Sequence, residues 1–244
     1  MKLHTKILTA LLTAATLNAA DVYATFSVEA DKSANLAFDA SGITKSVNYD
    51  ISESVKKGAI LASLSNEDTK ASLDMAKTAV AFSKRDYERQ LKVKDLIDAG
   101  KFDAFAFKYE DAKNQLAFAQ AKYNKTFLRA PFDGVIYEKD IEVGDTVSGM
   151  MLKTVFKIQS KRERKLILAF DQKYHSQVKV GQSFRYGVDG DTKEYRGVIT
   201  KVYPFANSAN RKIKAEVAAK DFVVGLFGEG YIEVSDAPNA DAKK

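Results

Sequence analysis

Residues 133–147 of this chain read DGVIYEKDIEVGDTV, and residues 41–55 read SGITKSVNYDISESV. In both stretches the second residue is a Gly that a Val follows 13 positions later, and the two glycines, Gly42 and Gly134, lie 92 residues apart. Each stretch has the pattern of a turn, a strand, a second turn and another strand. The repeat predicts two half-domains that complete one another in space and hold a long insertion between them.

The insertion has the composition of two long helices. The stretch from about residue 67 to residue 98 contains no Gly or Pro and is rich in Ala, Lys, Leu, Asp and Glu. Two residues at its start, Asn66 and Asp68, are suitable N-caps. Residues 99–102, Ala-Gly-Lys-Phe, are expected to break this helix, and Asp103 is expected to cap a second one.

Apolar and small residues recur along the second helix at spacings of four and three, which is typical of a coiled-coil seam. The predicted seam residues are Phe105, Tyr109, Ala112, Leu116, Ala119, Tyr123 and Thr126. The first helix repeats more loosely, with Leu73, Val80 and Tyr87 in one heptad position and Ala76, Ser83, Gln90 and Ile97 in another. Two antiparallel helices that pack along this seam leave the rest of their surface available for other chains.

The chain beyond the helices is predicted to be β-structure. Pro131 cannot continue the second helix, so the chain re-enters the split domain there. Short strands separated by Gly and Asp turns then predict a small antiparallel barrel, with strands expected at residues 165–170, 183–186, 195–202, 212–217 and 230–234. Residues 21–40 alternate in a way that suggests one or two strands leading in.

The N-terminal residues 1–20 have the form of a secretory signal peptide, with two lysines, an apolar stretch from Ile7 to Leu17 and small residues at the end. An uncleaved anchor is the weaker alternative, because a spanning helix needs roughly 20 apolar residues. The chain has no cysteine, which excludes disulfides, thiolate sites and a lipidated N-terminal cysteine. These features predict a soluble periplasmic protein.

The net charge of +6 is modest, and the lysines lie among acids on helical faces. A nucleic-acid surface would instead show a basic stripe with interleaved aromatics, so nucleic acid is not expected as a partner.

No residues point to catalysis. Of the two histidines, His4 lies in the signal peptide, and His175 alone makes neither a catalytic triad nor a zinc site. Three acids, Glu53, Asp133 and Asp145, fall in turns, where carboxylates commonly accept hydrogen bonds from local backbone N–H groups. The sequence also lacks a phosphate-binding loop and a dinucleotide fingerprint. We therefore expect no enzyme activity, no catalytic residues and no cofactor.

Metal ligands are equally sparse. Beyond the signal peptide the soft or imidazole ligands are Met75, Met150, Met151 and His175, and the two adjacent methionines are expected to pack at the junction of the split domain and the barrel. No metal site is expected, and by elimination organic compounds suit a transport role better than metal ions.

The order and spacing of these motifs resemble those of the periplasmic adaptor proteins of bacterial tripartite exporters, the HlyD-like membrane fusion proteins. The resemblance rests on the signal peptide, the two half-motifs, the hairpin, the re-entry sequence RAPFDG at residues 129–134 and the tail that ends in GEGY at residues 228–231. It covers nearly the whole chain.

The resemblance implies a split biotinyl/lipoyl-like β domain that is interrupted by an antiparallel coiled-coil α-hairpin and followed by a small antiparallel β-barrel. The implied divisions are a signal peptide at 1–20, N-terminal strands at 21–40, a first lipoyl-like half at 41–65, the α-helical hairpin at 66–127, a second lipoyl-like half at 128–158, the barrel at 159–234 and a disordered tail at 235–244. A membrane-proximal domain is expected to be small or absent.

Two departures from the family pattern carry expectations of their own. Carrier domains present a modified lysine on the turn into which this chain inserts its helices, so covalent biotin or lipoate is not expected. The first half-motif has Ser52-Glu53 where the second has Gly144-Asp145, so a positive φ is less easily adopted in the first half.

Family members that dock on an outer-membrane channel often carry an Arg, a Leu four residues on and a Ser seven beyond it at the hairpin tip. This spacing falls on Lys92, Leu96 and Asp103, of which only the Leu matches. These residues are candidates for contact with the channel. In the purely structural alternative, Lys92 is solvated, Leu96 packs across the seam and Asp103 is a helix cap.

The expected function is that of a periplasmic adaptor, held at the inner membrane by its partner. It would bridge an inner-membrane transporter of the resistance-nodulation-division type and an outer-membrane channel, self-associate into a ring and serve the export of small organic compounds. One alternative is an adaptor of an ATP-driven exporter or a type I secretion system. Another is a periplasmic structural or ligand-binding β module.

Overall fold

The computed structural model describes residues 20–234 of the chain, which form two compact units. One unit combines residues 20–30 with residues 162–234, and the other consists of residues 31–161. The predicted signal peptide, apart from Ala20, and the predicted tail at 235–244 lie outside the described residues.

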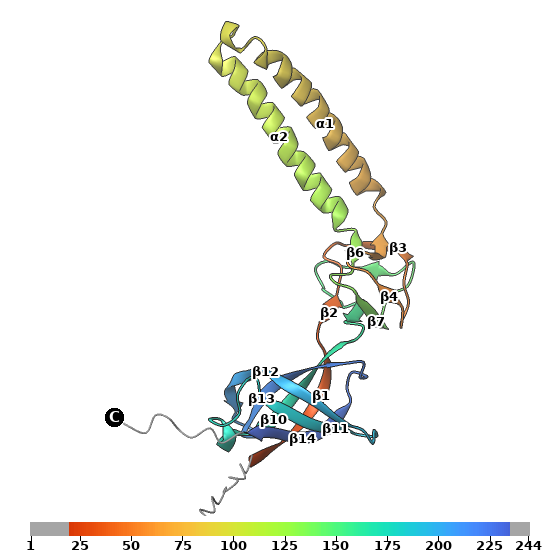
Figure 1. The fold of residues 1–244 in the computed structure, drawn as a ribbon. Coiled ribbons are helices and arrows are strands. Elements are labelled where there is room, and N and C mark those ends of the chain that lie inside the picture. The colour runs from red at the N-terminus through yellow and green to blue at the C-terminus, as the bar shows by residue number, and fades with distance from the viewer. Residues whose placement is uncertain (1–19, 235–244) are drawn as a thin grey trace, which may run out of the picture. The chain divides into compact units, whose positions relative to one another are not determined.

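The first unit is a closed antiparallel barrel of six strands in the order β1-β10-β13-β12-β11-β14 (Figure 1). The strands are β1 (Ala20–Ala30), β10 (Glu163–Asp171), β11 (Ser183–Val188), β12 (Glu194–Asn207), β13 (Lys212–Lys220) and β14 (Phe227–Val234), with a 3₁₀ turn, η2 (Gln172–Tyr174), after β10. Buried and more exposed residues alternate along β11 and β14, as expected for strands with one face in the core. Phe170, Phe184 and Ile232 are among the fully buried side chains.

The predicted barrel is confirmed, and it includes a strand that the sequence divisions left outside it. β1 pairs with β10 on one side and with β14 on the other, from Ala20 opposite Val234 to Ala30 opposite Arg164. The N-terminal strands expected at residues 21–40 therefore divide between the two units, since β2 (Ser33–Leu36) belongs to the second.

The second unit contains two four-stranded sheets that enclose one core. Their orders are β2-β9-β7-β4 and β6-β5-β3-β8. The strands besides β2 are β3 (Gly42–Val47), β4 (Ser54–Val55), β5 (Ile60–Leu64), β6 (Phe127–Arg129), β7 (Gly134–Lys139), β8 (Thr146–Val147) and β9 (Phe156–Gln159). Leu61, Leu64, Ile136, Phe156 and Ile158 are fully buried in this core. Each sheet combines strands from both sides of the helical insertion, so neither half closes without the other.

The two half-motifs pair with each other through equivalent contacts. Gly42 lies opposite Val147 in the β3–β8 pair, and Gly134 lies opposite Val55 in the β4–β7 pair. Four further backbone hydrogen bonds come in two matched pairs, related by the shift of 92 residues. They are Thr44 N to Asp145 O (2.8 Å) with Ile136 N to Glu53 O (3.1 Å), and Gly144 N to Thr44 O (2.9 Å) with Ser52 N to Ile136 O (2.8 Å).

A left-handed backbone conformation occurs at the same place in each half. Ser52 has φ of 71° and Gly144 has φ of 96°. The first half thus adopts a positive φ without a glycine, and the strain falls on Ser52.

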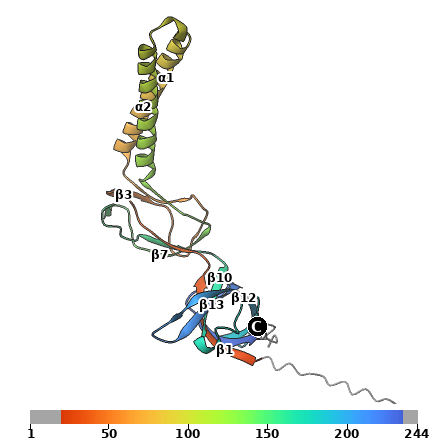
Figure 2. The same ribbon diagram turned by 90° about the vertical axis from the view of Figure 1, so that its left-hand side faces the viewer.

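Two consecutive antiparallel helices form the insertion, as Figure 1 and the rotated view in Figure 2 both show. They are α1 (Glu67–Leu91) and α2 (Ala99–Asn124), joined through a 3₁₀ turn, η1 (Lys94–Leu96). Every predicted seam residue on both helices is buried or half-buried. Among the described residues, no helix is long and apolar enough to cross a membrane.

The predicted helix boundaries at the tip are wrong. The first helix ends at Leu91 instead of about residue 98, and the second is capped by Asp98, whose Oδ1 accepts from Lys101 N at 3.1 Å. Asp103 lies inside the second helix and does not cap it. An N-cap carboxylate must accept from an unpaired N–H of the first helical turn. Asp98 does so at Lys101, and the helix runs through Gly100 without a break.

Candidate functional site

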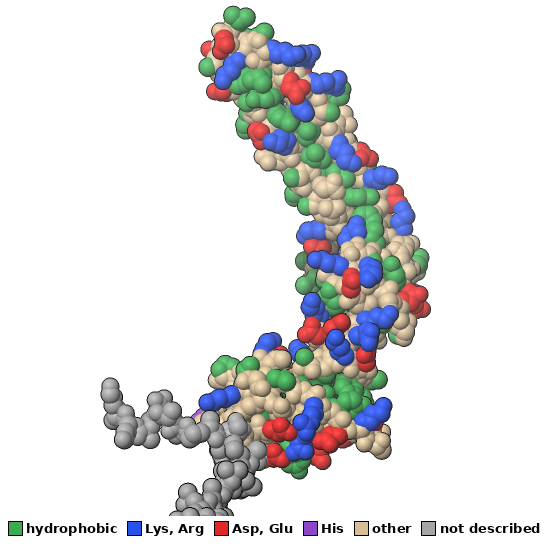
Figure 3. Space-filling view, viewed as in Figure 1, with side chains coloured by type: hydrophobic (Ala, Val, Ile, Leu, Met, Phe, Trp, Pro, Cys, Tyr) green, Lys and Arg blue, Asp and Glu red, His purple; other side chains and the backbone are tan. Residues whose placement is uncertain are grey.

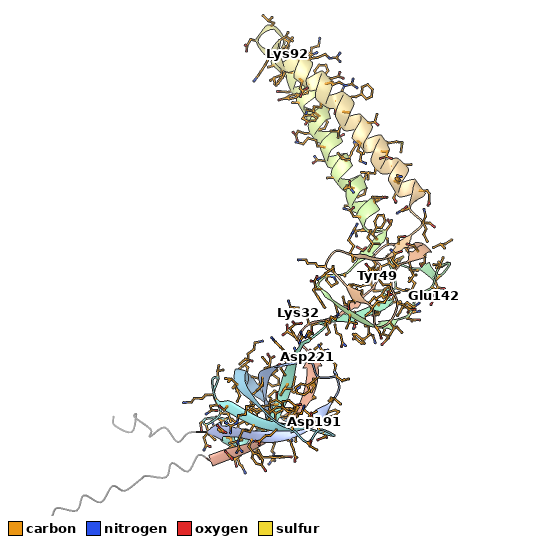
Figure 4. The ribbon with its side chains drawn as sticks, turned by 45° about the vertical axis from the view of Figure 1, so that its right-hand side comes forward. Lys32, Tyr49, Lys92, Glu142, Asp191 and Asp221 are labelled. Atoms are coloured by element: carbon orange, nitrogen blue, oxygen red, sulfur yellow. The ribbon has the colours of Figure 1, made fainter. Side chains whose placement is uncertain are left out.

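The tip of the hairpin presents apolar side chains to solvent. Leu96 is 85% exposed, and Leu91 and Val93 on either side of the α1 end are also exposed. Lys92, the C-cap residue of α1, lies at this end of the hairpin (Figure 4), and its side chain is exposed. Asp103, one turn into α2, is exposed as well. All three candidate residues are thus on the surface, in or next to the segment that joins the helices.

Two parts of the purely structural alternative fail at this tip. Leu96 does not pack across the seam, since most of its side chain is in solvent, and Asp103 is not a cap. Leu96 is therefore free for contact with another protein.

An aromatic cluster behind the tip holds the helix ends together. The Tyr87 ring stacks on Tyr109 and contacts Phe102, with centroids 5.6 Å apart in both pairs. Lys94 Nζ lies 5.1 Å from the Phe102 centroid, which draws the 3₁₀ turn onto the cluster. Phe102 is 9% exposed and lies within α2, whereas the sequence predicts a helix break there. Extending the seam by one step of three residues from Phe105 would have found it.

The outer face of α1 near the tip carries a shallow groove of about 510 Å³. Phe82, which is exposed, lies under the Arg85 guanidinium, whose Cζ is 4.4 Å from the ring centroid. Arg89 pairs with Asp86 in the same groove. Figure 3 shows hydrophobic side chains scattered among such charged groups along the hairpin.

Buried polar groups hold the two helices together at the base of the hairpin. Asn66 Nδ2 donates to Thr126 Oγ1 at 3.2 Å, and Thr126 Oγ1 donates to Tyr123 O at 2.7 Å. Asn66 occupies the N-cap position, as predicted, yet its side chain bonds across the hairpin and not to its own helix. The bond joins the start of α1 to the end of α2.

Ion pairs with the β domain support this base. Lys45 of β3 pairs with Glu67 at the start of α1, and Lys125 Nζ lies 2.7 Å from Asp39 Oδ2. The hydrogen bond from Lys45 is the main reason that the pKa of Glu67 lies below its ordinary value. The hairpin is thus attached to the split domain at both of its ends.

The turn acids act as backbone acceptors, as predicted. Glu53 Oε2 accepts from Asp50 N and Asp145 Oδ2 accepts from Glu142 N, both at 2.8 Å. Asp133 Oδ1 accepts from Lys57 N at 2.8 Å. This backbone bond, helped by the Lys56 ammonium, holds the pKa of Asp133 below its ordinary value.

The remaining candidate ligands lie apart. His175 is exposed, with Nδ1 3.2 Å from Gln172 O. Residues 20–234 contain no group of three or more His, Asp or Glu side chains arranged to hold a metal ion. Met150 and Met151 are 94% and 77% exposed, and their packing at the junction of the split domain and the barrel stays a prediction. They follow β8 in a turn that leaves the sheet.

A family model for the CzcB-like barrel-sandwich hybrid domain matches residues 32–159. A curated relative, the cobalt-zinc-cadmium resistance protein CzcB of Cupriavidus metallidurans, is 29% identical over 135 residues, which are 48% of this chain and 26% of that protein. The matched part of the chain thus spans about a quarter of that relative's length.

Solved structures resemble the chain over most of its length. A MacA-MexA chimeric protein with the Pseudomonas aeruginosa MexA α-hairpin domain has a TM-score of 0.79 at 20% identity, over 88% of this chain and 81% of that chain. MacA from Actinobacillus actinomycetemcomitans has a TM-score of 0.72 at 18% identity, over 88% and 78%. ZneB from Cupriavidus metallidurans has a TM-score of 0.59 at 18% identity, over 88% and 71%. These matches show a shared fold.

Proposed function

The chain belongs to the family of the CzcB-like barrel-sandwich hybrid domain, and we propose that it is a periplasmic adaptor of the membrane fusion type in a tripartite efflux system. It bridges an inner-membrane transporter and an outer-membrane channel and has no enzyme activity. Its place is the periplasm, at the inner membrane, to which its transporter partner holds it.

The observation that carries this proposal is the exposed apolar tip on a hairpin that is fixed at its base. Leu96 is 85% exposed at one end of the hairpin, and the Asn66–Thr126 bond closes the other end. Leu91, Val93 and Leu96 expose apolar side chains within six residues, and exposed apolar groups that cluster mark interaction sites. We assign Lys92, Leu96 and Asp103 to contact with the channel.

The finer description of the fold is part of the proposal. We infer that the interrupted β domain is of the biotinyl/lipoyl-like type and that α1 and α2 form a coiled coil along the seam. The insertion occupies the turn on which a carrier domain presents its lysine. The domain therefore serves as a base for the hairpin and carries no biotin or lipoate.

Several copies are proposed to pack side by side into a ring through their hairpins. Large apolar side chains away from the seam support this, since Met75, Phe82, Phe107 and Phe118 are all more than half exposed. The barrel and the lipoyl-like domain would bind the transporter, which is proposed to be of the resistance-nodulation-division type.

The exported compounds are proposed to be small organic molecules. The second candidate is a divalent metal ion, which the CzcB relative favours as a cobalt-zinc-cadmium resistance protein. A panel of toxic compounds separates the two classes. A strain that lacks the protein should become more sensitive to dyes and detergents if the first holds, and to cobalt, zinc or cadmium salts if the second does.

Complementation of this strain tests the adaptor role. The wild-type gene should restore resistance, whereas Leu96→Asp should fail because a charge replaces the apolar contact at the tip. The control, Leu96→Met, keeps an apolar side chain of similar size at the same position and should restore resistance. Both variants must accumulate normally. Full resistance with Leu96→Asp would contradict the assignment of the tip.

Two other functions predict different results. An adaptor of an ATP-driven exporter or a type I secretion system would depend on the tip in the same way, but its phenotype would require a different transporter gene. A periplasmic ligand-binding β module would be indifferent to Leu96→Asp.

A further inference from the structure

The barrel carries a groove of its own. It lies between the segment after β10, which contains η2, and the hairpin formed by β12 and β13, and its volume is about 860 Å³. This volume is within the range of roughly 300–1,000 Å³ that is typical of small-molecule sites. All of its lining residues belong to the barrel unit.

A break in strand pairing opens the groove. The register of β12 against β13 shifts between Val202 and Ala206, which lie opposite Ala215 and Ile213. Pro204, in the middle of the shift, has no N–H to donate to a ladder. Residues 203–205 thus form an irregularity within β12, and Phe205 is 59% exposed at the rim while the buried Ile213 forms part of the floor.

The Tyr203 side chain, which forms part of the groove, is held in place by Glu216. Tyr203 OH donates to Glu216 Oε1 at 2.8 Å, and Lys201 Nζ lies 2.9 Å from Glu216 Oε2. Glu216 is 8% exposed; burial raises its pKa, but the bonds from Lys201 and Tyr203 outweigh burial and hold it below the ordinary value. With its hydroxyl bonded, Tyr203 presents its ring beside that of Phe205, with centroids 6.1 Å apart.

The charges at the groove are mainly positive. Lys173 and Arg211 line it, against one acid, Asp171. The Asp171 carboxylate already accepts from Lys173 N at 2.9 Å, as the cap of η2. Within residues 20–234, the Arg211 side chain has no ion pair.

The backbone around Arg211 is held in place. Arg211 has φ of 56°, its N–H donates to Asn207 O at 2.7 Å and its carbonyl accepts from Gln172 N at 3.0 Å. The last bond joins the β12–β13 turn to η2, so the two sides of the groove are tied together. A site organised in this way loses little entropy when a ligand binds.

We propose that this groove binds a small amphipathic organic anion. Its carboxylate or sulfonate pairs with Lys173 and Arg211, and its aromatic or alicyclic body packs against Tyr203 and Phe205. Charge complementarity selects the anion, and the apolar wall selects the ring body. The site is independent of the adaptor role, since it requires neither a channel nor a transporter.

A matched pair of probes tests the proposal on the full chain. The anionic probe is 8-anilino-1-naphthalenesulfonate, and N-phenyl-1-naphthylamine supplies the same ring body without the charge. Methyl NMR during the titration locates the binding through the signals of Val202 and Ile213. We expect the anionic probe to shift these signals and to bind at least about threefold more tightly than the neutral one, given one charge-assisted contact at an exposed site.

Variants separate charge from shape. Arg211→Gln should weaken anionic binding by about threefold to tenfold and leave the neutral probe unchanged, because it removes one charged partner. Phe205→Ala should weaken both probes. The control, Arg196→Gln, removes an exposed arginine of β12 that does not line the groove and should change neither. Equal binding of the two probes, an unaffected Arg211→Gln variant, or shifts confined to hairpin signals would each overturn the proposal.

Discussion

The two half-motifs, residues 41–55 and 133–147, form equivalent hydrogen bonds and turns with different residues. Lys57 N donates to Asp133 Oδ1 at 2.8 Å, and the equivalent Gly149 N donates to Ser41 Oγ at 3.0 Å. The left-handed position is Ser in the first half and Gly in the second. What the repeat preserves is therefore the hydrogen-bonding geometry, while the chemistry and the space around each position differ.

The largest difference is expected at the paired glycines. A Cβ on Gly134 would lie 2.5 Å from the backbone oxygen of Gln159, whereas a Cβ on Gly42 would meet Leu64 at 3.4 Å, which is ordinary contact. Gly134→Ala should lower the free energy of unfolding by about 2–3 kcal/mol, because backbone must shift. Gly42→Ala should change it by less than about 1 kcal/mol.

Urea unfolding followed by circular dichroism at the helical band measures both variants, since the helices belong to the same unit as the glycines. An equal loss of unfolding free energy for the two substitutions would mean that a Cβ meets the same resistance in both halves, which would contradict the close contact expected at Gly134.

A smaller difference of opposite sign is expected at the left-handed positions. Gly144→Ala places a Cβ at φ of 96° and should cost about 1–2 kcal/mol. Ser52→Gly relieves the strain at φ of 71° but adds freedom to the unfolded chain, so it should leave stability unchanged or raise it by up to about 1 kcal/mol. Thermal unfolding of the two variants measures both effects. A clearly destabilised Ser52→Gly would show that the serine is not strained.

The smallest expected effect is a difference between the halves in how their stability depends on pH. The pKa of Asp133 is depressed, chiefly by the bond from Lys57 N, so its ionised form stabilises the folded state above the unfolded pKa. This contribution is lost as the pH falls through the lower, folded-state pKa. The stability difference between the wild type and Asp133→Asn should therefore shrink below pH of about 4, near the ordinary Asp value.

Ser41→Ala is the matched variant in the other half. Its effect should be the same at every pH, because a hydroxyl does not titrate in this range. A pH-dependent difference for Ser41→Ala, or a constant one for Asp133→Asn, would contradict the assigned roles.

The sequence predicted the parts of the fold that depend on local pattern. The pairing of the two half-motifs, the two helices and the burial of the expected seam residues all follow from spacing and turn chemistry. The β1 pairing with β10 and β14 did not, because nothing in residues 20–30 specifies partners more than 130 positions away. Long-range pairing depends on the closed barrel as a whole.

Helix propensity predicts the helix ends at the tip incorrectly. Residues 92–98 have no helix breaker, so their departure from α1 depends on the packing of Lys94 and Phe102. The exposure of Leu96 follows from this departure. The groove at Tyr203 could not be foreseen either, since it depends on a register shift between two strands.

The measurement that tests the adaptor role most directly is cysteine cross-linking in cells of the organism that carries the gene. The chain has no native cysteine, so single cysteines at Leu96, Asp103 and, as a control away from the tip, Met75 report only on their own positions. We expect the tip positions to capture an outer-membrane channel and Met75 not to. Normal accumulation of the protein without capture from either tip position would contradict the account.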